Sequence, residues 1–128
     1  MVTTPEISAV RDADRVVGLL EANRITDIKL ILNRIRPAMV KNNDMMSVED
    51  VLDILSVKLI GVIPDDEQVI VSTNKGEPLV LADKPSLAGT AYMNVAKRLE
   101  GKEIEFLQLE VPQKGIFARL SNWISGNA

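Results

Sequence analysis

The sequence predicts an α/β protein in which parallel strands are joined by crossover helices, and two observations lead to this class. Short apolar runs alternate with longer stretches whose apolar residues recur at helical spacing. The apolar runs are almost continuous, as in parallel strands that are covered on both faces. The chain offers only two strong strands and one stub, so we expect the sheet to begin outside this chain.

The first expected elements are a strand stub and a helix. The stub, residues 2–4, stops before Pro5. The helix runs to about residue 22, with Ser8 as its N-cap and Asn23 as its terminator. We expect four of its apolar residues to face inward, namely Val10, Val16, Val17 and Leu20.

The middle of the chain supplies a strand and a second helix. Residues 28–32 are apolar except for Lys29, which suits a buried strand, and residues 37–44 are polar and loop-like. Ser47 then offers an N-cap, and Asp50 follows it three residues on, in a variant of the capping box. We expect this helix to reach about Leu55.

The last expected elements are the clearest strand and two helices. The strand, residues 58–63, ends at Pro64. Acidic residues 65–67 crowd the next helix start, where the positive end of the helix dipole favours them. A longer helix opens at residues 85–86 and closes at Gly101. The apolar residues at helical spacing in this helix are Leu87, Ala91, Val95 and Leu99.

The end of the chain carries an apolar stripe after a break at residues 112–114. Wound as a helix at about 100° per residue, its apolar residues fall inside an arc of about 120°. Two interpretations stay open: the stripe meets a bilayer surface, or it forms a terminal helix that docks on the protein's own core. The residues of the stripe are Ile116, Phe117, Leu120, Trp123 and Ile124.

Composition excludes several classes of function. The 128 residues suit one domain, and a net charge of -3 argues against a nucleic-acid surface. The absence of cysteine and histidine excludes zinc chemistry and Ser–His or Cys–His catalysis. No run approaches the roughly 20 apolar residues of a membrane span, and no signal peptide is recognisable. We therefore expect a cytoplasmic protein that at most lies on a membrane.

Four segments resemble, in order, parts of the MinD family, the bacterial ATPases that position the division septum. They are residues 3–15 (TTPEISAVRDADR), 47–55 (SVEDVLDIL), 61–66 (GVIPDD) and 72–78 (STNKGEP). The end of the chain resembles the family's membrane-targeting helix. The resemblance implies that residues 1–109 are the C-terminal half of a P-loop NTPase-type domain and residues 110–128 a linker and an amphipathic membrane helix.

The resemblance also implies ATP or ADP with Mg²⁺ as the ligand of the complete protein. The family holds the phosphates in a deviant Walker A loop, and this sequence contains no Gly-x-x-x-x-Gly-Lys-Ser/Thr run or relative of it. The aspartate-containing switch segment that helps to organise Mg²⁺ is absent as well. We predict that these 128 residues alone do not hydrolyse ATP.

Two residue pairs are expected to follow the two strong strands, namely Asn33 with Arg34 and Pro64 with Asp65. Ligands of open α/β sheets bind beyond the carboxyl ends of the strands. An asparagine amide can donate to and accept from an adenine edge, and a proline ring can pack on the base. The resemblance implies that Asn33 recognises adenine while the other three residues line the pocket. The alternative is that Asn33 only ends a strand and Pro64 only starts a turn.

The resemblance further implies a homodimer whose edge binds MinC, which inhibits division-ring assembly, and MinE, which stimulates hydrolysis. The candidate partner residues are Arg11, Asp12, Asp14, Asp50, Asn74 and Gly76. The alternative interpretation is that the charged residues among them only form solvated helix faces.

For the membrane helix, the resemblance implies a peripheral position on the cytoplasmic face of the inner membrane. A helix this short is marginal in water, so we expect it to order only on lipid, and two tails in a dimer to bind more firmly than one. Its only cations are Lys114 and Arg119, which predicts a modest dependence on salt. The candidate lipid-binding residues are Lys114, Ile116, Phe117, Arg119, Leu120, Trp123 and Ile124.

Two competing functions are weighed against this interpretation. One is a membrane-docking or protein-interaction module without catalysis, which would have no use for an adenine pocket. The other is a relative of partition-type ATPases that binds DNA, which the acidic balance and the apolar tail oppose.

Overall fold

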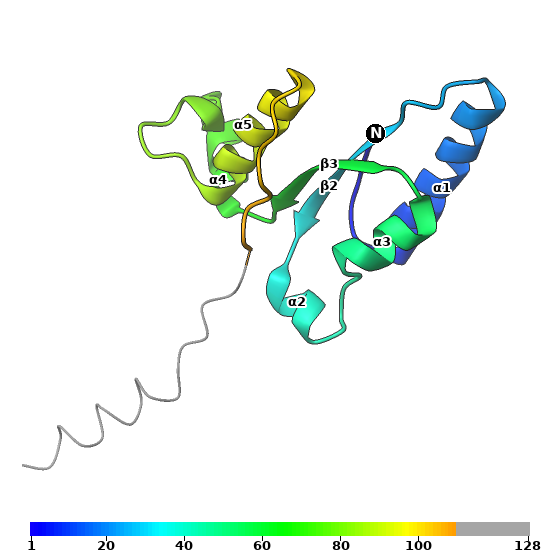
Figure 1. The fold of residues 1–128 in the computed structure, drawn as a ribbon. Helices are drawn as coiled ribbons and strands as arrows, with labels where there is room; N and C mark the ends of the chain where they lie inside the picture. Colours follow the sequence, from blue (N-terminus) through cyan, green and yellow to red (C-terminus); the bar gives the residue numbers. More distant parts are fainter. Residues whose placement is uncertain (110–128) are drawn as a thin grey trace, which may run out of the picture.

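Three strands form one parallel sheet in the order β1-β2-β3 in the computed structural model, which describes residues 1–109 (Figure 1). The strands are β1 (Val2–Thr3), β2 (Lys29–Ile35) and β3 (Lys58–Pro64). Val2 pairs with Ile31, and Lys29 pairs with Lys58. The predicted α/β class with a parallel sheet and crossover helices is confirmed.

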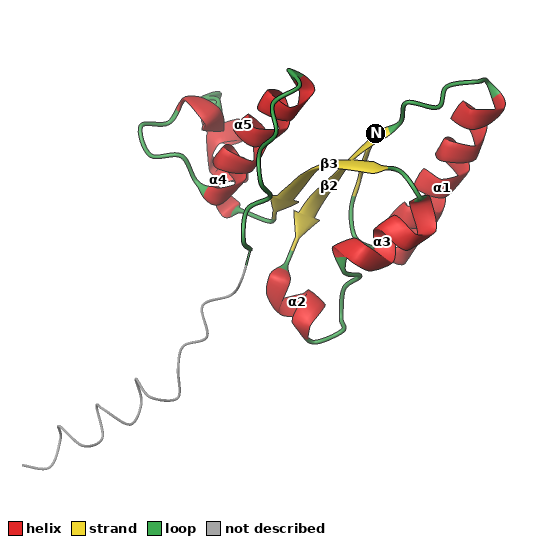
Figure 2. Cartoon of the chain, in the orientation of Figure 1, coloured by secondary structure: helices red, strands yellow, loops and turns green. Residues whose placement is uncertain are grey.

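Helices cover both faces of this sheet (Figure 2). Helices α1 and α3 cover one face, and α4 and α5 cover the other. Each pair packs against its own cluster of buried residues. The helices are α1 (Ile7–Ala22), α2 (Pro37–Lys41), α3 (Val48–Leu55), α4 (Glu67–Lys75) and α5 (Leu87–Leu99), with a 3-10 turn at Leu79–Leu81.

The larger core cluster lies between β2 and the helices α1 and α3. Leu30 and Leu32 of β2 are completely buried, and Val51 of α3 packs against them. The capping box predicted at Ser47 is present, since its hydroxyl accepts from the Asp50 backbone N–H and its own N–H donates to the Asp50 carboxylate. This cap fixes where α3 begins on the sheet.

The second core cluster lies between β3 and α5. Ile60 and Ile63 of β3 pack against Ala91 and Val95 of α5. A Cβ atom added at Gly61 would lie 2.3 Å from Cγ2 of Val95, so only glycine allows this close approach of helix and strand.

Several expected boundaries are corrected by the structure. The region 37–44 is not all loop, because Pro37 occupies the first turn of the short helix α2, where proline is favoured. Helix α1 begins at Ile7 without a side-chain cap, so Ser8 is inside the helix. Strand β2 continues beyond residue 32 to Ile35. We expected Val16 to face inward, but it is exposed.

The ends of α5 are also more exposed than its helical spacing suggested. Ala91 and Val95 are buried, whereas Leu87 and Leu99 are exposed. The buried face of α5 runs through Ala88, Ala91 and Val95, and Leu87 and Leu99 lie off this face.

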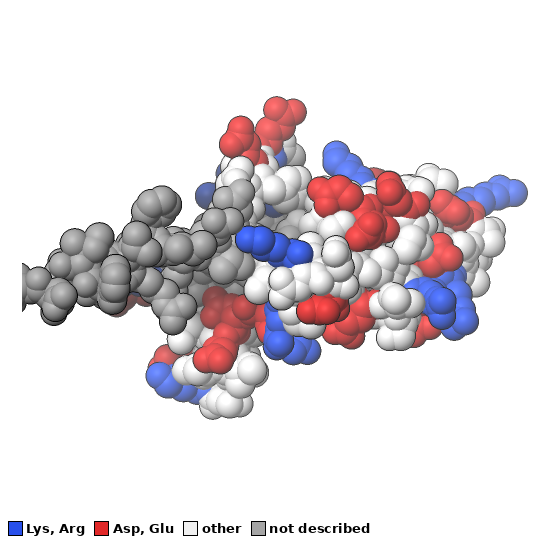
Figure 3. All heavy atoms as spheres, turned by 90° about the horizontal axis from the view of Figure 1, so that it is seen from below, with Lys and Arg blue, Asp and Glu red and all other residues white. Residues whose placement is uncertain are grey.

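The surface of the described residues mixes charges of both signs. On the face shown in Figure 3, acidic and basic side chains are interspersed, and neither sign dominates it. Within residues 1–109, no helix has both the length and the apolar character needed to cross a membrane.

Candidate functional site

The carboxyl ends of β2 and β3 meet at Asp65, the first residue after β3. Its backbone N–H donates to the carbonyl oxygen of Ile35, the last residue of β2, at 2.9 Å. Its carboxylate accepts from Nε of Arg34 at 3.3 Å and from Nε of Arg36 at 2.5 Å. The parallel strands therefore bring together two arginines and one carboxylate at the sheet edge where ligands of α/β proteins bind.

This arrangement keeps the Asp65 carboxylate ionised. The hydrogen bond from Arg36 lowers the pKa of Asp65, partial burial opposes this effect, and the hydrogen bond from Arg34 adds to it. Both guanidinium groups are more than half exposed, so solvent screens the pairs. The result is a fixed anion between two cations whose outer N–H groups face solvent.

The conformation at the end of β2 depends on Asn33. Its side-chain oxygen accepts from the backbone N–H of Arg34 at 3.0 Å. Arg34 adopts a positive φ of 59°, and the pairing register shifts between Leu32 and Ile35. Asn33 and Arg34 therefore lie in an irregular part of β2, which corrects the expectation that they follow the strand.

A hollow of about 510 Å³ opens beside this cluster. Ligand pockets in proteins typically measure roughly 300–1,000 Å³, so the hollow has room for a group the size of one nucleobase. The structure places Arg34 and Asp65 on its wall, whereas Asn33, which is half-buried, and Pro64, which is buried as the last residue of β3, do not line it. The lining residues are Arg34, Ile35, Arg36, Pro37, Ala38, Asp65, Asp66, Glu67 and Ile70.

Sequence reasoning missed Arg36 and Asp66. Arg36 lies just beyond β2 and reaches the same carboxylate as Arg34. Strand alternation could not have revealed this, because Arg34 has a positive φ and interrupts the extended chain. Asp66 is the N-cap of α4, and its carboxylate accepts from the Gln68 backbone N–H at 2.9 Å. Burial raises the pKa of Asp66, but hydrogen bonds from Ser86 and from the backbone N–H groups of Gln68 and Ala88 outweigh it, so the net shift is downward.

The described residues offer a magnesium ion no cluster of ligands. Residues 1–109 contain no group of three or more His, Cys, Asp or Glu side chains placed to hold a metal ion.

The candidate partner residues divide between two places. Arg11, Asp12 and Asp14 are exposed on α1, where Asp12 also pairs with Arg15 at 3.1 Å. Asp50 belongs to the same side, and the hydrogen bonds from Ser47 in the capping box lower its pKa.

Asn74 and Gly76 lie at the end of α4, which covers the other face of the sheet (Figure 1). Gly76 closes α4 in the left-handed conformation, with φ of 70°. The structure thus does not gather the six residues into one patch. The candidate lipid-binding residues, 114–124, lie outside the described residues.

Comparisons with known proteins agree with this architecture, although no protein-family model matches the chain. Over 128 residues the chain is 62% identical to a putative septum site-determining protein MinD of Guillardia theta, covering all of this chain and 48% of that relative. The chain thus spans about half the length of the curated relatives that it matches.

Solved structures show the same fold. A MinC:MinD cell division protein complex of Aquifex aeolicus matches with a TM-score of 0.80 and 46% identity, over 84% of this chain and 44% of that chain. The septum site-determining protein MinD of Pyrococcus horikoshii, complexed with Mg-ADP, matches with a TM-score of 0.66 and 27% identity, over 77% and 40%. With its parallel sheet and its sequence identity, the chain belongs to the MinD family of septum site-determining proteins and matches their C-terminal part.

Proposed function

We propose that this chain supplies the base-binding part of a MinD-type ATPase that places the division septum. The observation that carries the proposal is the cluster of Arg34, Arg36 and Asp65 beside the hollow at the carboxyl ends of β2 and β3. A relative with this fold was solved with Mg-ADP, which supports a nucleotide as the ligand of the complete protein.

The residues present fit the base of a nucleotide but not its phosphates. The hollow has the size for adenine. Asn33 does not line the hollow itself, but its side-chain oxygen holds the backbone N–H of Arg34 on the wall, and an asparagine amino group can donate to the edge of a base. The phosphates and Mg²⁺ supply the hydrolytic chemistry when bound. Their Gly-Lys loop is not in these 128 residues.

Calorimetry with ATP, ADP and GDP tests the base-binding proposal on the 128-residue chain. We expect weak binding, with adenine nucleotides preferred over GDP, and no measurable hydrolysis. Submicromolar affinity for ATP would contradict the proposal, because it requires phosphate contacts that this chain does not supply. Equal binding of GDP would contradict the adenine pocket.

We also propose that residues 110–128 attach the protein to the inner membrane as a linker and an amphipathic helix. The apolar stripe of this segment and its few cations support attachment mainly by apolar insertion. Sedimentation with anionic vesicles tests this proposal. We expect binding that persists at about 0.3 M salt, whereas complete loss there would indicate attachment by charge.

The partners proposed for the complete protein are a second copy, a MinC-like protein and a MinE-like protein. The MinC:MinD complex among the structural neighbours supports the second of these. The exposed carboxylates of Asp12 and Asp14 are the sites to change. We expect Asp12→Ala with Asp14→Ala to reduce capture of both partners by the complete protein, and unchanged capture would count against this assignment.

A further inference from the structure

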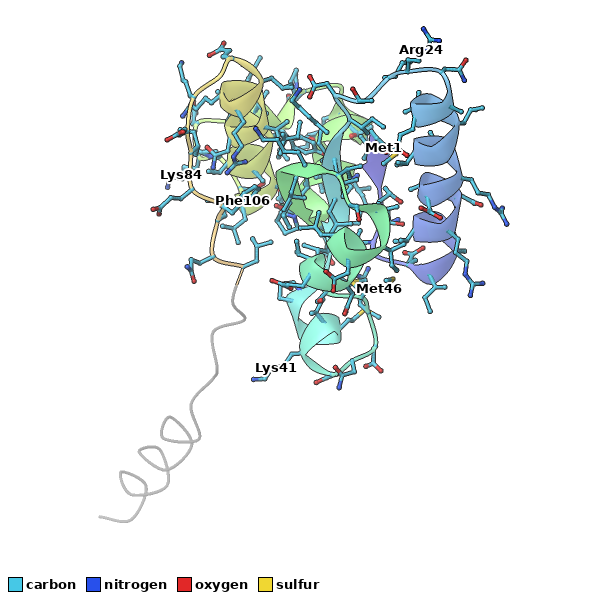
Figure 4. All side chains as sticks on the ribbon, turned by 45° about the vertical axis from the view of Figure 1, so that its right-hand side comes forward. Met1, Arg24, Lys41, Met46, Lys84 and Phe106 are labelled. Carbon is cyan, nitrogen blue, oxygen red and sulfur yellow. The ribbon has the colours of Figure 1, made fainter. Side chains whose placement is uncertain are left out.

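An apolar groove of about 1130 Å³ lies beside β3, on the side of α2 and α3. Val48 and Leu52 of α3 form one wall, Val62 of β3 forms the floor, and Phe106 and Leu109 form the opposite wall. The segment that carries Phe106 descends past the sheet toward α2, which carries Lys41 (Figure 4). The groove is larger than a typical small-molecule pocket, so it can hold several side chains at once.

Arg98 of α5 fixes the wall that contains Phe106. Its guanidinium donates to the carbonyl oxygens of Ile60, Ile104 and Glu105 at 2.9–3.0 Å. It also lies 4.0 Å from the centre of the Phe106 ring, a distance at which cation and ring attract each other. Three carbonyl contacts and one ring contact hold the chain against β3 just before residues 107–109.

We propose that the chain's own segment 110–128 docks its apolar stripe in this groove when no lipid is present. Leu109, the last described residue, lines the groove, so the next residues emerge beside it. The stripe begins at Ile116, and seven residues extend at most about 25 Å, which is enough to reach any part of the groove. Wound as a helix, residues 116–124 span about 12 Å.

Tethering makes this docking possible even if the contact is weak. A short flexible linker gives a local concentration of about 1 mM, so the docked state dominates when the free segment would bind with a Kd below that value. Lys41 and Glu49 on the rim supply one charge of each sign, and Glu49 is complementary to Lys114 and Arg119. Docking thus covers the apolar stripe with groove residues in place of water. The segment can then become ordered without lipid, which differs from the expectation that it orders only on lipid.

Docking and membrane attachment then compete for the same apolar residues. The apparent affinity for vesicles is the affinity of the free segment multiplied by the fraction of molecules whose segment is free. Docking itself does not depend on the membrane attachment proposed above; only the competition does. The groove is thus an internal docking site that lowers the affinity of the chain for membranes.

Fluorescence of Trp123, the chain's single tryptophan, tests docking without lipid. We expect its emission in the full chain to be blue-shifted and protected from acrylamide, compared with a peptide of residues 110–128. Val48→Glu places a charge on the groove wall in the first turn of α3, where the helix dipole favours an acid. This variant should give the red-shifted, quenchable emission of the peptide.

Val71→Glu is the matched control, because Val71 is 40% exposed on α4 and is not a wall of the groove. It should leave the emission unchanged. Phe106→Ser, at a residue that is 44% exposed, is a second groove variant in case Val48→Glu lowers the helical circular dichroism. Peptide-like emission from the unmodified chain would overturn the proposal. Emission that is the same in both groove variants as in the unmodified chain would overturn it too. So would protection from acrylamide that varies with protein concentration, because contacts between copies would then cause it.

Sedimentation with vesicles of phosphatidylglycerol and phosphatidylethanolamine tests the competition. If nine-tenths of the molecules are docked, Val48→Glu should raise vesicle affinity about tenfold, and Val71→Glu should not. Equal affinity of Val48→Glu and the unmodified chain would contradict the competition. If no variant binds vesicles, membrane attachment is wrong, and the Trp123 spectra still decide whether the segment docks.

Discussion

At the residue scale, the carboxylate of Asp65 holds the ends of two strands together. It accepts from Arg34 and Arg36 of the β2 end, while its backbone N–H donates to Ile35. Its side chain is 24% exposed, whereas both arginines are more than half exposed. Solvent therefore weakens each ion pair. The geometry of the site depends on all three interactions of Asp65, namely the two ion pairs and the backbone hydrogen bond.

The change Asp65→Asn should destabilise the chain by about 0.5–1 kcal/mol near pH 7, because two screened ion pairs are lost. Since the pKa of Asp65 is lowered on folding, the contribution of its carboxylate is present above its unfolded pKa of about 3.9 and is lost as the pH falls through the folded value. Urea unfolding at about pH 7 and about pH 3 measures this difference.

The control for this prediction is Asp27→Asn. Asp27 pairs with Lys29, but its side chain is 83% exposed, so we expect its loss to be smaller. The difference in the free energy of unfolding between Asp65→Asn and the unmodified chain should shrink toward low pH. If it grows instead, the arginines do not hold the carboxylate in its ionised form.

The residues of this site could be predicted only in part. Arg34 and Asp65 were both expected after the ends of their strands; the structure brings them together, although Arg34 lies inside β2. Arg36 was missed because β2 was expected to end at residue 32 rather than at Ile35. The positive φ of Arg34 could not be predicted either, since it depends on the register shift between two strands.

At the element scale, the packing of α5 on β3 depends on Gly61. The change Gly61→Ala forces a methyl group against Val95, a stiff β-branched side chain, and we expect a loss of about 1–3 kcal/mol in the free energy of unfolding. Gly18→Ala is the matched control, because no atom lies within 4 Å of its added methyl group. It should stabilise α1 by about 0.5–1 kcal/mol, as helical alanine does.

Thermal or urea unfolding of both alanine variants decides this point. If Gly61→Ala is as stable as the unmodified chain, α5 does not lie as close to β3 as described. Equal destabilisation by Gly18→Ala would show that the cost is a general effect of losing glycine rather than a clash at this contact.

Arg98 determines whether the wall of the groove stays in place. The change Arg98→Met removes the donor to three carbonyl groups while keeping a similar apolar stem. We expect chymotrypsin to cut after Phe106 about tenfold faster, because the segment opens more often. Lys97→Met, on the neighbouring residue, is the control, and equal rates of cutting in the two variants would contradict the role given to Arg98.

Element types were easier to predict than element ends. The apolar runs and caps predicted three strands and the helices α1, α3, α4 and α5, because these signals are local. The short helix α2 was missed because its five residues are too few to show helical spacing and the polar residues 42–44 that follow it suggested a loop. Val16 is exposed because the buried face of α1 runs through Val10, Ala13 and Val17, and Val16 lies off this face.

At the scale of the whole molecule, the three-stranded sheet of the described residues carries a polar site and an apolar groove at different places. The carboxyl ends of β2 and β3 form the polar cluster and the hollow beside it, and the apolar groove lies along the face between α3 and the segment after α5. The short β1 is at the edge of the three-stranded sheet of residues 1–109.

Titration of the isotope-labelled chain with ADP, followed by NMR, tests whether the carboxyl ends of β2 and β3 receive the base of an adenine nucleotide, as proposed. We expect the amide signals of Asn33, Arg34 and Asp65 to move with ADP and with adenosine, and to stay in place with GDP or inorganic phosphate. If these signals stay fixed while others move, or if phosphate alone moves them, the base does not bind at this edge of the sheet.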